Sequence, residues 1–163
     1  MSMNTFKPLR ITKQTEMDIK AAPATVFPLL CPVREYEWIE PWKCRMLYSE
    51  SGVAENNCIF ETDFAHNGGT ETWIVSRYEK DRCIEFVRFT AQEKIVKLDI
   101  LLEAAHSGGT RMSWRKTYTG LSLQGNRTAK AMADDFEPEA KRISEMLNHY
   151  LATGNMLPLT HMG

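Results

Sequence analysis

Residues 126–153 read NRTAKAMADDFEPEAKRISEMLNHYLAT, and their apolar side chains repeat with the period of a helix. The residues on this apolar stripe are Ala129, Met132, Phe136, Ala140, Ile143, Leu147 and Tyr150. The stripe keeps its phase across Pro138, which lacks an amide donor and crowds the carbonyl group of Asp134. The stretch therefore predicts one long helix that bends near Pro138 and buries one face.

Ahead of this helix, apolar and polar residues alternate with the period of a half-buried strand. The alternating runs lie at residues 11–19, 44–50, 58–64, 70–78, 83–90, 94–105 and 110–119. Turn sequences such as HNGG at 66–69 and HSGG at 106–109 separate the later runs, with no helical pattern between them. These runs predict seven antiparallel strands, six of them in a continuous meander.

Two short helices are expected after the first strand, in AAPATVFPLL at 21–30 and at 33–38. The predicted class is therefore α+β, with a curved seven-stranded antiparallel sheet wrapped around a long C-terminal helix, the only element long enough to cover one sheet face. At 163 residues the chain has the size of one domain. We expect that domain at 9–154, with tails at 1–8 and 155–163.

Composition gives little support to several classes of partner. The 20 basic and 21 acidic residues nearly cancel, so there is no electrostatic reason to expect nucleic acid. The chain has no signal-peptide pattern at its start and no run of eighteen apolar residues. A cytoplasmic protein without integral membrane association is expected, and the composition leaves the oligomeric state open.

Three short segments fit this order of elements to a known superfamily. IKAAPATVF at 19–27 is similar to its strand-to-helix entry, GGTRMSW at 108–114 to the start of its last strand, and LNHYLATG at 147–154 to the end of its long helix. On these residues the chain resembles the Bet v 1-like or START-like superfamily, also called SRPBCC. The resemblance implies a helix-grip fold whose cavity, between sheet and helix, commonly holds a hydrophobic ligand.

Alternation along the strands indicates which residues face the helix and such a cavity, because the bulkier and more apolar set of each strand is expected inside. That set comprises Phe60, Thr62, Phe64, Glu71, Trp73, Val75, Ile84, Phe86, Arg88, Val96, Leu98, Ile100, Leu102, Met112, Trp114, Lys116 and Tyr118. The aliphatic members are expected in the core. Trp73, Trp114 and Tyr118 also bring a polar group to a cavity wall.

Glu71, Arg88 and Lys116 lie on faces that are otherwise apolar. A buried charge without a partner is costly, so such groups pair with one another or meet a polar ligand. One interpretation is an ion pair of Glu71 with Lys116 or with Arg88. The other is that one cation binds a carboxylate, phenolate or enolate, near an aromatic hydroxyl such as that of Tyr118 if protons are transferred.

The segment CPVREYEWIEPWKC, at 31–44, carries two tryptophans and two cysteines, and the twelve residues between the cysteines include no histidine. We interpret it as a wall: Trp38, together with Trp42, closes one end of the cavity. A surface turn held in place by the two tryptophans is the alternative. Four of the five charged residues of the segment are expected in solvent, namely Arg34, Glu35, Glu37 and Glu40.

No motif for a nucleotide, a catalytic triad or a metal is recognisable in the chain. His66 and His106 lie in similar turns, but these turns are three apart in a meander and should lie at opposite ends of the sheet. No cofactor and no metal site is therefore expected. The candidate ligand-binding residues are Trp38, Phe60, Glu71, Trp73, Arg88, Trp114, Lys116, Tyr118, Phe136 and Tyr150.

Three functions are compatible with these features. The favoured hypothesis is binding of a small, largely apolar molecule with one polar end, such as a lipid, isoprenoid, polyketide or aromatic metabolite. A polyketide cyclase or dehydratase that uses acid and base groups in the cavity is the first alternative, so whether the protein is an enzyme is left open. A protein-interaction module resembling the Hsp90-ATPase-activator branch is the second, and it predicts a filled cavity and an exposed apolar patch.

Overall fold

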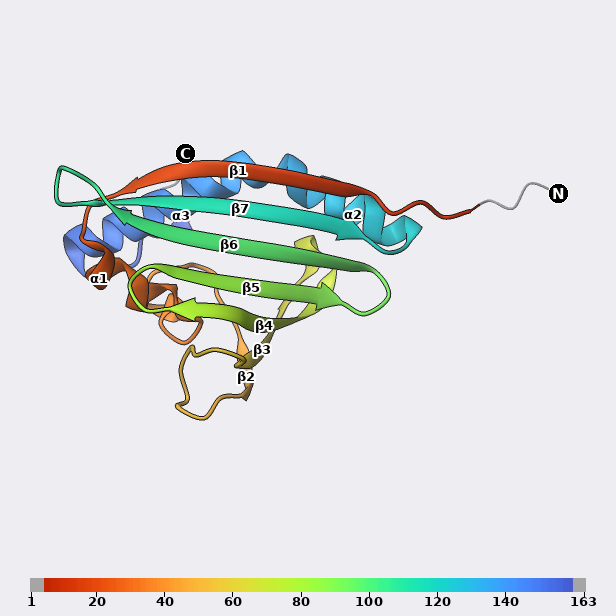
Figure 1. Ribbon diagram of the computed structural model, residues 1–163, viewed down its shortest axis with the longest axis horizontal. Coiled ribbons are helices and arrows are strands. Elements are labelled where there is room, and N and C mark those ends of the chain that lie inside the picture. The colour runs from red at the N-terminus through yellow and green to blue at the C-terminus, as the bar shows by residue number, and fades with distance from the viewer. Residues whose placement is uncertain (1–4, 160–163) are drawn as a thin grey trace.

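The computed structural model describes residues 5–159. A single curved antiparallel sheet forms one layer of the protein (Figure 1). The sheet has seven strands in the order β1-β7-β6-β5-β4-β3-β2. The strands are β1 Arg10–Ile19, β2 Arg45–Tyr48, β3 Ile59–Phe64, β4 Gly69–Glu79, β5 Cys83–Thr90, β6 Lys94–Ala104 and β7 Thr110–Gly120. The helices are α1 Pro23–Val26, η1 Phe27–Leu30, η2 Glu35–Glu37, η3 Ala65–Asn67, α2 Leu123–Asp134 and α3 Phe136–Thr153.

The first strand pairs with the last. β1 and β7 run antiparallel in unbroken register from Arg10 opposite Thr119 to Ile19 opposite Thr110. The remaining strands pair with their neighbours in the chain, as the predicted meander requires. The predicted fold class is confirmed, including the seven strands and the short helices after β1.

α2 and α3 together cover one face of the sheet, and Figure 1 shows them running along its length behind β1 and β7. The single bent helix that the sequence predicts is interrupted at Asp135. Pro138 cannot donate a hydrogen bond to the Asp134 carbonyl, which accounts for a bend at this point. The helix also begins earlier than predicted, because the Ser122 hydroxyl accepts a hydrogen bond from the Gly125 amide at 2.9 Å and caps it.

The core lies between the helices and the inner face of the sheet. The strand residues expected inside are buried, except that Phe64 is half-buried near the end of β3. From α2 and α3, Ala129, Phe136 and Leu147 are fully buried against them. Every second residue of the strands thus packs against the residues that recur with a period of 3.6 in the helix, along one apolar interface.

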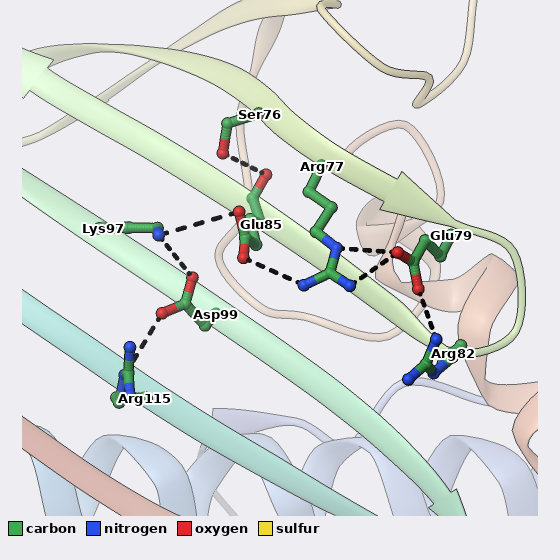
Figure 2. Close-up of polar contacts among 8 residues, drawn as sticks. All are labelled: Ser76, Arg77, Glu79, Arg82, Glu85, Lys97, Asp99 and Arg115. Carbon is green, nitrogen blue, oxygen red and sulfur yellow. Dashed lines mark hydrogen bonds and ion pairs between the residues drawn. The ribbon is translucent and has the colours of Figure 1, made fainter.

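The outer face of the sheet carries a network of charges, drawn in Figure 2. Glu85 lies between Arg77 and Lys97, and Asp99 lies between Lys97 and Arg115. Arg77, Lys97 and Arg115 are 42–56% exposed, so each of these ion pairs contributes little to stability. The sheet face that carries this network is the one exposed to solvent.

His66 and His106 lie at opposite ends of the sheet, as predicted. His66 belongs to η3 between β3 and β4, at the end where β6 begins, whereas His106 lies in the turn where β6 ends. Among residues 5–159, no three His, Cys, Asp or Glu side chains gather in a group that could hold a metal ion. None of the described helices has the length and apolar character needed to cross a bilayer.

The two predicted tails, 1–8 and 155–163, lie partly outside the described residues. In the described part, the Lys7 carbonyl accepts a hydrogen bond from the Asn126 amide group at 3.0 Å. At the other end, Leu157 packs against the core and the Leu159 backbone amide donates to Glu40 at 3.2 Å. The C-terminal segment therefore folds back towards η2.

Gly125 sets how closely α2 approaches the turn between β5 and β6. A methyl group at this position would overlap the backbone carbonyl of Glu93. Gly125→Ala should therefore lower the free energy of unfolding by at least about 2 kcal/mol, measured by urea denaturation. Arg127→Ala, on the exposed side of the same helix, is the control and should change it by less than about 0.5 kcal/mol. A Gly125→Ala protein as stable as the control would contradict this packing.

Candidate functional site

A cavity of about 240 Å³ lies between the inner face of the sheet, α3 and the segment that contains η1 and η2. Its aromatic lining residues are Trp38, Trp42, Phe60, Phe64, Trp73, Phe86 and Trp114. Its aliphatic lining residues are Leu30, Ile39, Pro41, Leu98, Ile100, Ile143, Met146 and Leu159. The polar lining residues are Glu35, Glu40, His66, Asn67, Arg88, Lys116, Glu139 and Arg142.

Three aromatic rings from β3, β4 and β5 form the floor of the cavity. Phe60 and Trp73 are stacked, with ring centres 5.2 Å apart, and Phe86 meets both rings edge-on. They meet because Phe60 lies directly opposite Trp73 in the register of β3 and β4. The Trp73 indole N–H donates to the Thr62 hydroxyl at 2.9 Å, which fixes the orientation of the indole.

Trp38 and Trp42 close one side of the cavity. Each indole N–H donates to a backbone carbonyl at 2.8 Å, Trp38 to Leu29 and Trp42 to Pro32. The expectation that this segment is a cavity wall is consistent with both placements. Leu159, in the C-terminal segment, lines the cavity as well, although the sequence analysis placed that segment in a tail.

Glu35 corrects one expectation. Four of the five charged residues of this segment were expected in solvent, yet Glu35 is half-buried and both it and Glu40 line the cavity. Burial raises the pKa of Glu35 from its ordinary value of 4.5 to about 8. The side chain is therefore an uncharged carboxylic acid at neutral pH. By contrast, Arg34 and Glu37 form an ion pair at 2.7 Å, both about 40% exposed, as expected for solvent-facing groups.

Glu71 and Lys94 form a fully buried ion pair beside the cavity. The Lys94 ammonium group donates to Glu71 Oε2 at 2.8 Å and to the Thr90 hydroxyl at 3.0 Å. Lys94 was not among the residues expected inside, although its position on β6 has the inward parity of Val96 and Leu98. Lys116 and Arg88 were the expected partners of Glu71.

Lys116 takes a different partner, Glu139 on α3. Its ammonium group lies 2.8 Å from each carboxylate oxygen of Glu139 and 5.1 Å from the centre of the Trp114 ring. Burial lowers the pKa of Lys116, and the charge of Glu139 opposes this only in part. Burial would raise the pKa of Glu139, but the positive charges of Lys116 and Arg88 outweigh it and keep this pKa low. The Lys116 nitrogen lies within hydrogen-bond distance of both Glu139 oxygens, the geometry of a lysine bound to a carboxylate.

Arg88 lies between these two ion pairs. Its Nε is 3.5 Å from Glu71 Oε2, and its guanidinium carbon lies 4.6 Å from the centre of the Trp73 ring. The side chain is only 6% exposed. Within residues 5–159, no acceptor lies in hydrogen-bonding position for its Nε–H. The ion pair of Glu71 with Arg88 that the sequence suggested is thus present, but at a longer distance than the pair with Lys94.

Six of the ten candidate residues line the cavity: Trp38, Phe60, Trp73, Arg88, Trp114 and Lys116. The other four do not. Glu71 is buried behind Arg88, and Phe136 is buried in the core. Tyr118 is also fully buried, and its hydroxyl has no partner in the described part of the chain. The Tyr150 hydroxyl donates to Glu37 at 2.8 Å, near the surface.

Sequence reasoning missed two charged lining residues of α3 that the helical period could have identified. Glu139 lies three positions after Phe136 and four before Ile143, on the same helical face. Arg142 lies at the edge of that face, where it forms an ion pair with Asp135 at 2.8 Å. No comparable signal existed for Glu35, because a three-residue 3-10 turn is too short to show a periodic pattern.

Removing Lys94 should destabilise the protein strongly, because Glu71 would lose its closest partner inside the core. We expect Lys94→Met to cost roughly 3 kcal/mol of unfolding free energy, measured by urea denaturation. Lys97→Met is the matched control on the same strand, where the ammonium group is 42% exposed on the outer face, and it should cost less than about 1 kcal/mol. Equal losses in the two variants would contradict the buried pair.

Glu35 should make stability depend on pH. The folded protein keeps this carboxyl protonated up to about pH 8, whereas the unfolded chain releases the proton near 4.5. Its contribution to stability is therefore complete below pH 4.5 and is lost as the pH rises through 8. Glu35→Gln should be more stable than the wild type by about 1–3 kcal/mol at alkaline pH and similar to it in acid. Urea denaturation of both proteins at several pH values between acid and alkaline conditions measures this difference in unfolding free energy. Glu145→Gln, on the exposed side of α3, should show no such gain.

The fold has relatives among solved structures. No family model matches the chain, and no curated protein matches it. An uncharacterized protein from Rhizobium leguminosarum superposes with a TM-score of 0.64 at 15% identity, over 88% of this chain and 97% of its own. Ara h 8.0201 gives 0.62 at 13% identity, over 88% and 99%. DynU16, from the dynemicin biosynthetic locus, gives 0.59 at 14% identity, over 88% of this chain and 48% of its own.

These identities are too low to transfer an activity, but the shared architecture extends over most of the chain. The order of strands, the short helices after β1 and the C-terminal helices α2 and α3 agree with the superfamily that the sequence resembles. The chain therefore has the helix-grip fold of Bet v 1-like, or SRPBCC, proteins.

Proposed function

We propose that the protein binds a small, largely apolar molecule in the cavity between the sheet and α3. The observation that carries this proposal is the cavity itself: about 240 Å³ between the sheet and α3, lined mostly by aromatic and aliphatic side chains. Well-packed cores leave few spaces larger than a water molecule. A space of this size under the helix therefore favours a ligand over simple core packing.

The open cavity also helps to decide between the alternatives. An interaction module without a small-molecule site predicts that side chains fill this space. DynU16, one structural neighbour, comes from a biosynthetic locus, a setting that suits a small organic ligand. Binding of such a ligand therefore explains the cavity better than a protein partner does.

Glu35 supports an acid/base enzyme as a second candidate function. An uncharged carboxylic acid with a pKa of about 8 that lines an apolar cavity has the properties of a general acid near neutral pH. It lies outside the two buried ion pairs, so its titration is not needed to hold the fold together. A cyclase or dehydratase requires such a group, whereas a binding protein does not.

Filling the cavity should abolish binding. Ile143 lines the cavity from α3 and is only half-buried, so Ile143→Trp places an indole in the ligand space. We expect native mass spectrometry of freshly purified wild-type protein to show an adduct of roughly a few hundred daltons and Ile143→Trp to lack it. Lys141→Trp, on the exposed side of the same helix, should keep it.

The contrary result is equally clear. If the wild-type protein has its bare mass, and neither a neutral bicyclic compound such as indole nor a lipid such as palmitate binds to it in calorimetry, the cavity has no ligand function. The interaction module would then be the better explanation.

A further inference from the structure

The charges around the cavity do not balance. Three buried cations, Arg88, Lys94 and Lys116, face two buried or half-buried carboxylates, Glu71 and Glu139. Lys94 binds Glu71 at 2.8 Å, and Lys116 binds both oxygens of Glu139 at 2.8 Å. Each lysine therefore has a carboxylate of its own, and Arg88 is the cation left over.

Other charged groups of the lining do not supply the missing negative charge. Glu35 is uncharged at neutral pH. Glu40 is exposed and accepts a hydrogen bond from the Leu159 backbone amide. Arg142 forms an ion pair with Asp135 at the surface. The excess inside the cavity is thus one positive charge.

Within residues 5–159, Arg88 also makes no hydrogen bond. The nearest carboxylate oxygen lies 3.5 Å from Nε and already accepts from Lys94 at 2.8 Å. Among the described residues no hydrogen bond to Nε–H forms, and the Trp73 ring is the other close contact of the guanidinium group. A guanidinium group carries five N–H donors in a plane, and leaving them unpaired inside a protein is costly. The side chain lines the cavity at 6% exposure, so an occupant of the cavity can supply the missing acceptor.

The cavity volume limits the size of that occupant. An engineered apolar cavity of about 150 Å³ takes up one benzene molecule. This cavity, of about 240 Å³, is larger, and the extra volume is roughly that of a second aromatic ring. Seven aromatic side chains contribute to its walls. A flat aromatic molecule of two fused rings fits this volume and can pack against these faces and edges, whereas a long lipid chain exceeds it.

We infer that the ligand is a compact aromatic acid, with about two fused rings and one carboxylate, and that Arg88 binds the carboxylate. This inference rests on the proposed function and narrows it. A single negative charge matches the single excess cation. A carboxylate matches the planar guanidinium group, which can donate two parallel hydrogen bonds to its two oxygens.

Two probes of equal shape test the role of charge. We would measure by calorimetry the binding of 2-naphthoate and of 2-naphthamide, its uncharged analogue, to the wild-type protein. The carboxylate should bind about tenfold or more tightly than the amide, since hydrogen bonds to charged groups are about twice as strong as neutral ones. This comparison does not depend on any variant folding correctly.

Substitution of Arg88 should remove that preference. In Arg88→Met the affinity for 2-naphthoate should fall to that for 2-naphthamide, while the amide binds as before. Arg88→Lys keeps the charge without the planar group and should retain part of the preference. Arg115→Met is the control: Arg115 is an exposed arginine on the outer face of β7, drawn in Figure 2, and its loss should leave the preference unchanged. Circular dichroism and thermal unfolding establish which variants are folded.

The possible results separate this inference from the proposed function. Equal binding of the two probes to the wild-type protein overturns the role of Arg88 and leaves an apolar ligand site in place. Binding of palmitate with no binding of either naphthalene probe overturns the aromatic acid and also leaves the proposed function standing. If none of the three compounds binds, both proposals are wrong.

Discussion

The burial of the inner sheet face under α2 and α3 is the constraint on which the rest of the structure depends. Without the helices, apolar rows from every strand except β2 would face water, and the helical stripe would have nothing to cover it. The two periodicities are matched along the length of the sheet: alternate residues of the strands meet every third or fourth residue of the helix. The close approach of α2 at Gly125 and the interruption at Asp135 set how the helical layer follows this curved face.

The same constraint creates the cavity. The inner face of the sheet and α3 do not pack against each other everywhere, and the large side chains of Trp38, Trp73 and Trp114 fill the space between them only in part. Charged residues are present there because ion pairs across the interface satisfy them. Glu139 reaches from α3 to Lys116 on β7, and Lys94 reaches from β6 to Glu71 on β4. These pairs tie together elements that the chain brings close only in the folded state.

Some of the candidate site could be predicted because strand alternation is a local property. Parity alone placed Phe60, Trp73, Arg88, Trp114 and Lys116 on the inner face, and all five line the cavity. Parity could not tell how far along the strand the cavity extends. Glu71 and Tyr118 have the correct parity, but both are fully buried and neither lines the cavity. The helical stripe likewise placed Phe136 inside, but it could not show whether Phe136 meets the cavity.

The pairing of charges depended on the tertiary structure for a different reason. Glu71 had two plausible partners in the sequence, yet it binds Lys94, whose ammonium group arrives from two strands away. Lys116 instead meets a carboxylate that comes from α3. Each ion pair that forms removes one carboxylate from the partners open to the remaining cations. The cation that is left without its own carboxylate can therefore be identified only from the complete set of pairs. The protonated state of Glu35 arises in the same way, since burial in the assembled wall, and not its neighbours in the chain, raises its pKa.

The sequence by itself determined the seven strands, the strand order expected of a meander, the inward faces and the helical stripe, because these follow from local periodicity and turn chemistry. Only the tertiary structure decided that β1 closes against β7, that residues 157–159 fold back towards η2, and that the interface leaves about 240 Å³ empty. Each of these depends on distances between segments remote in the chain. A pattern of residues specifies which faces must be buried, but how completely two buried faces fill the space between them is fixed by the shape of the assembled layers.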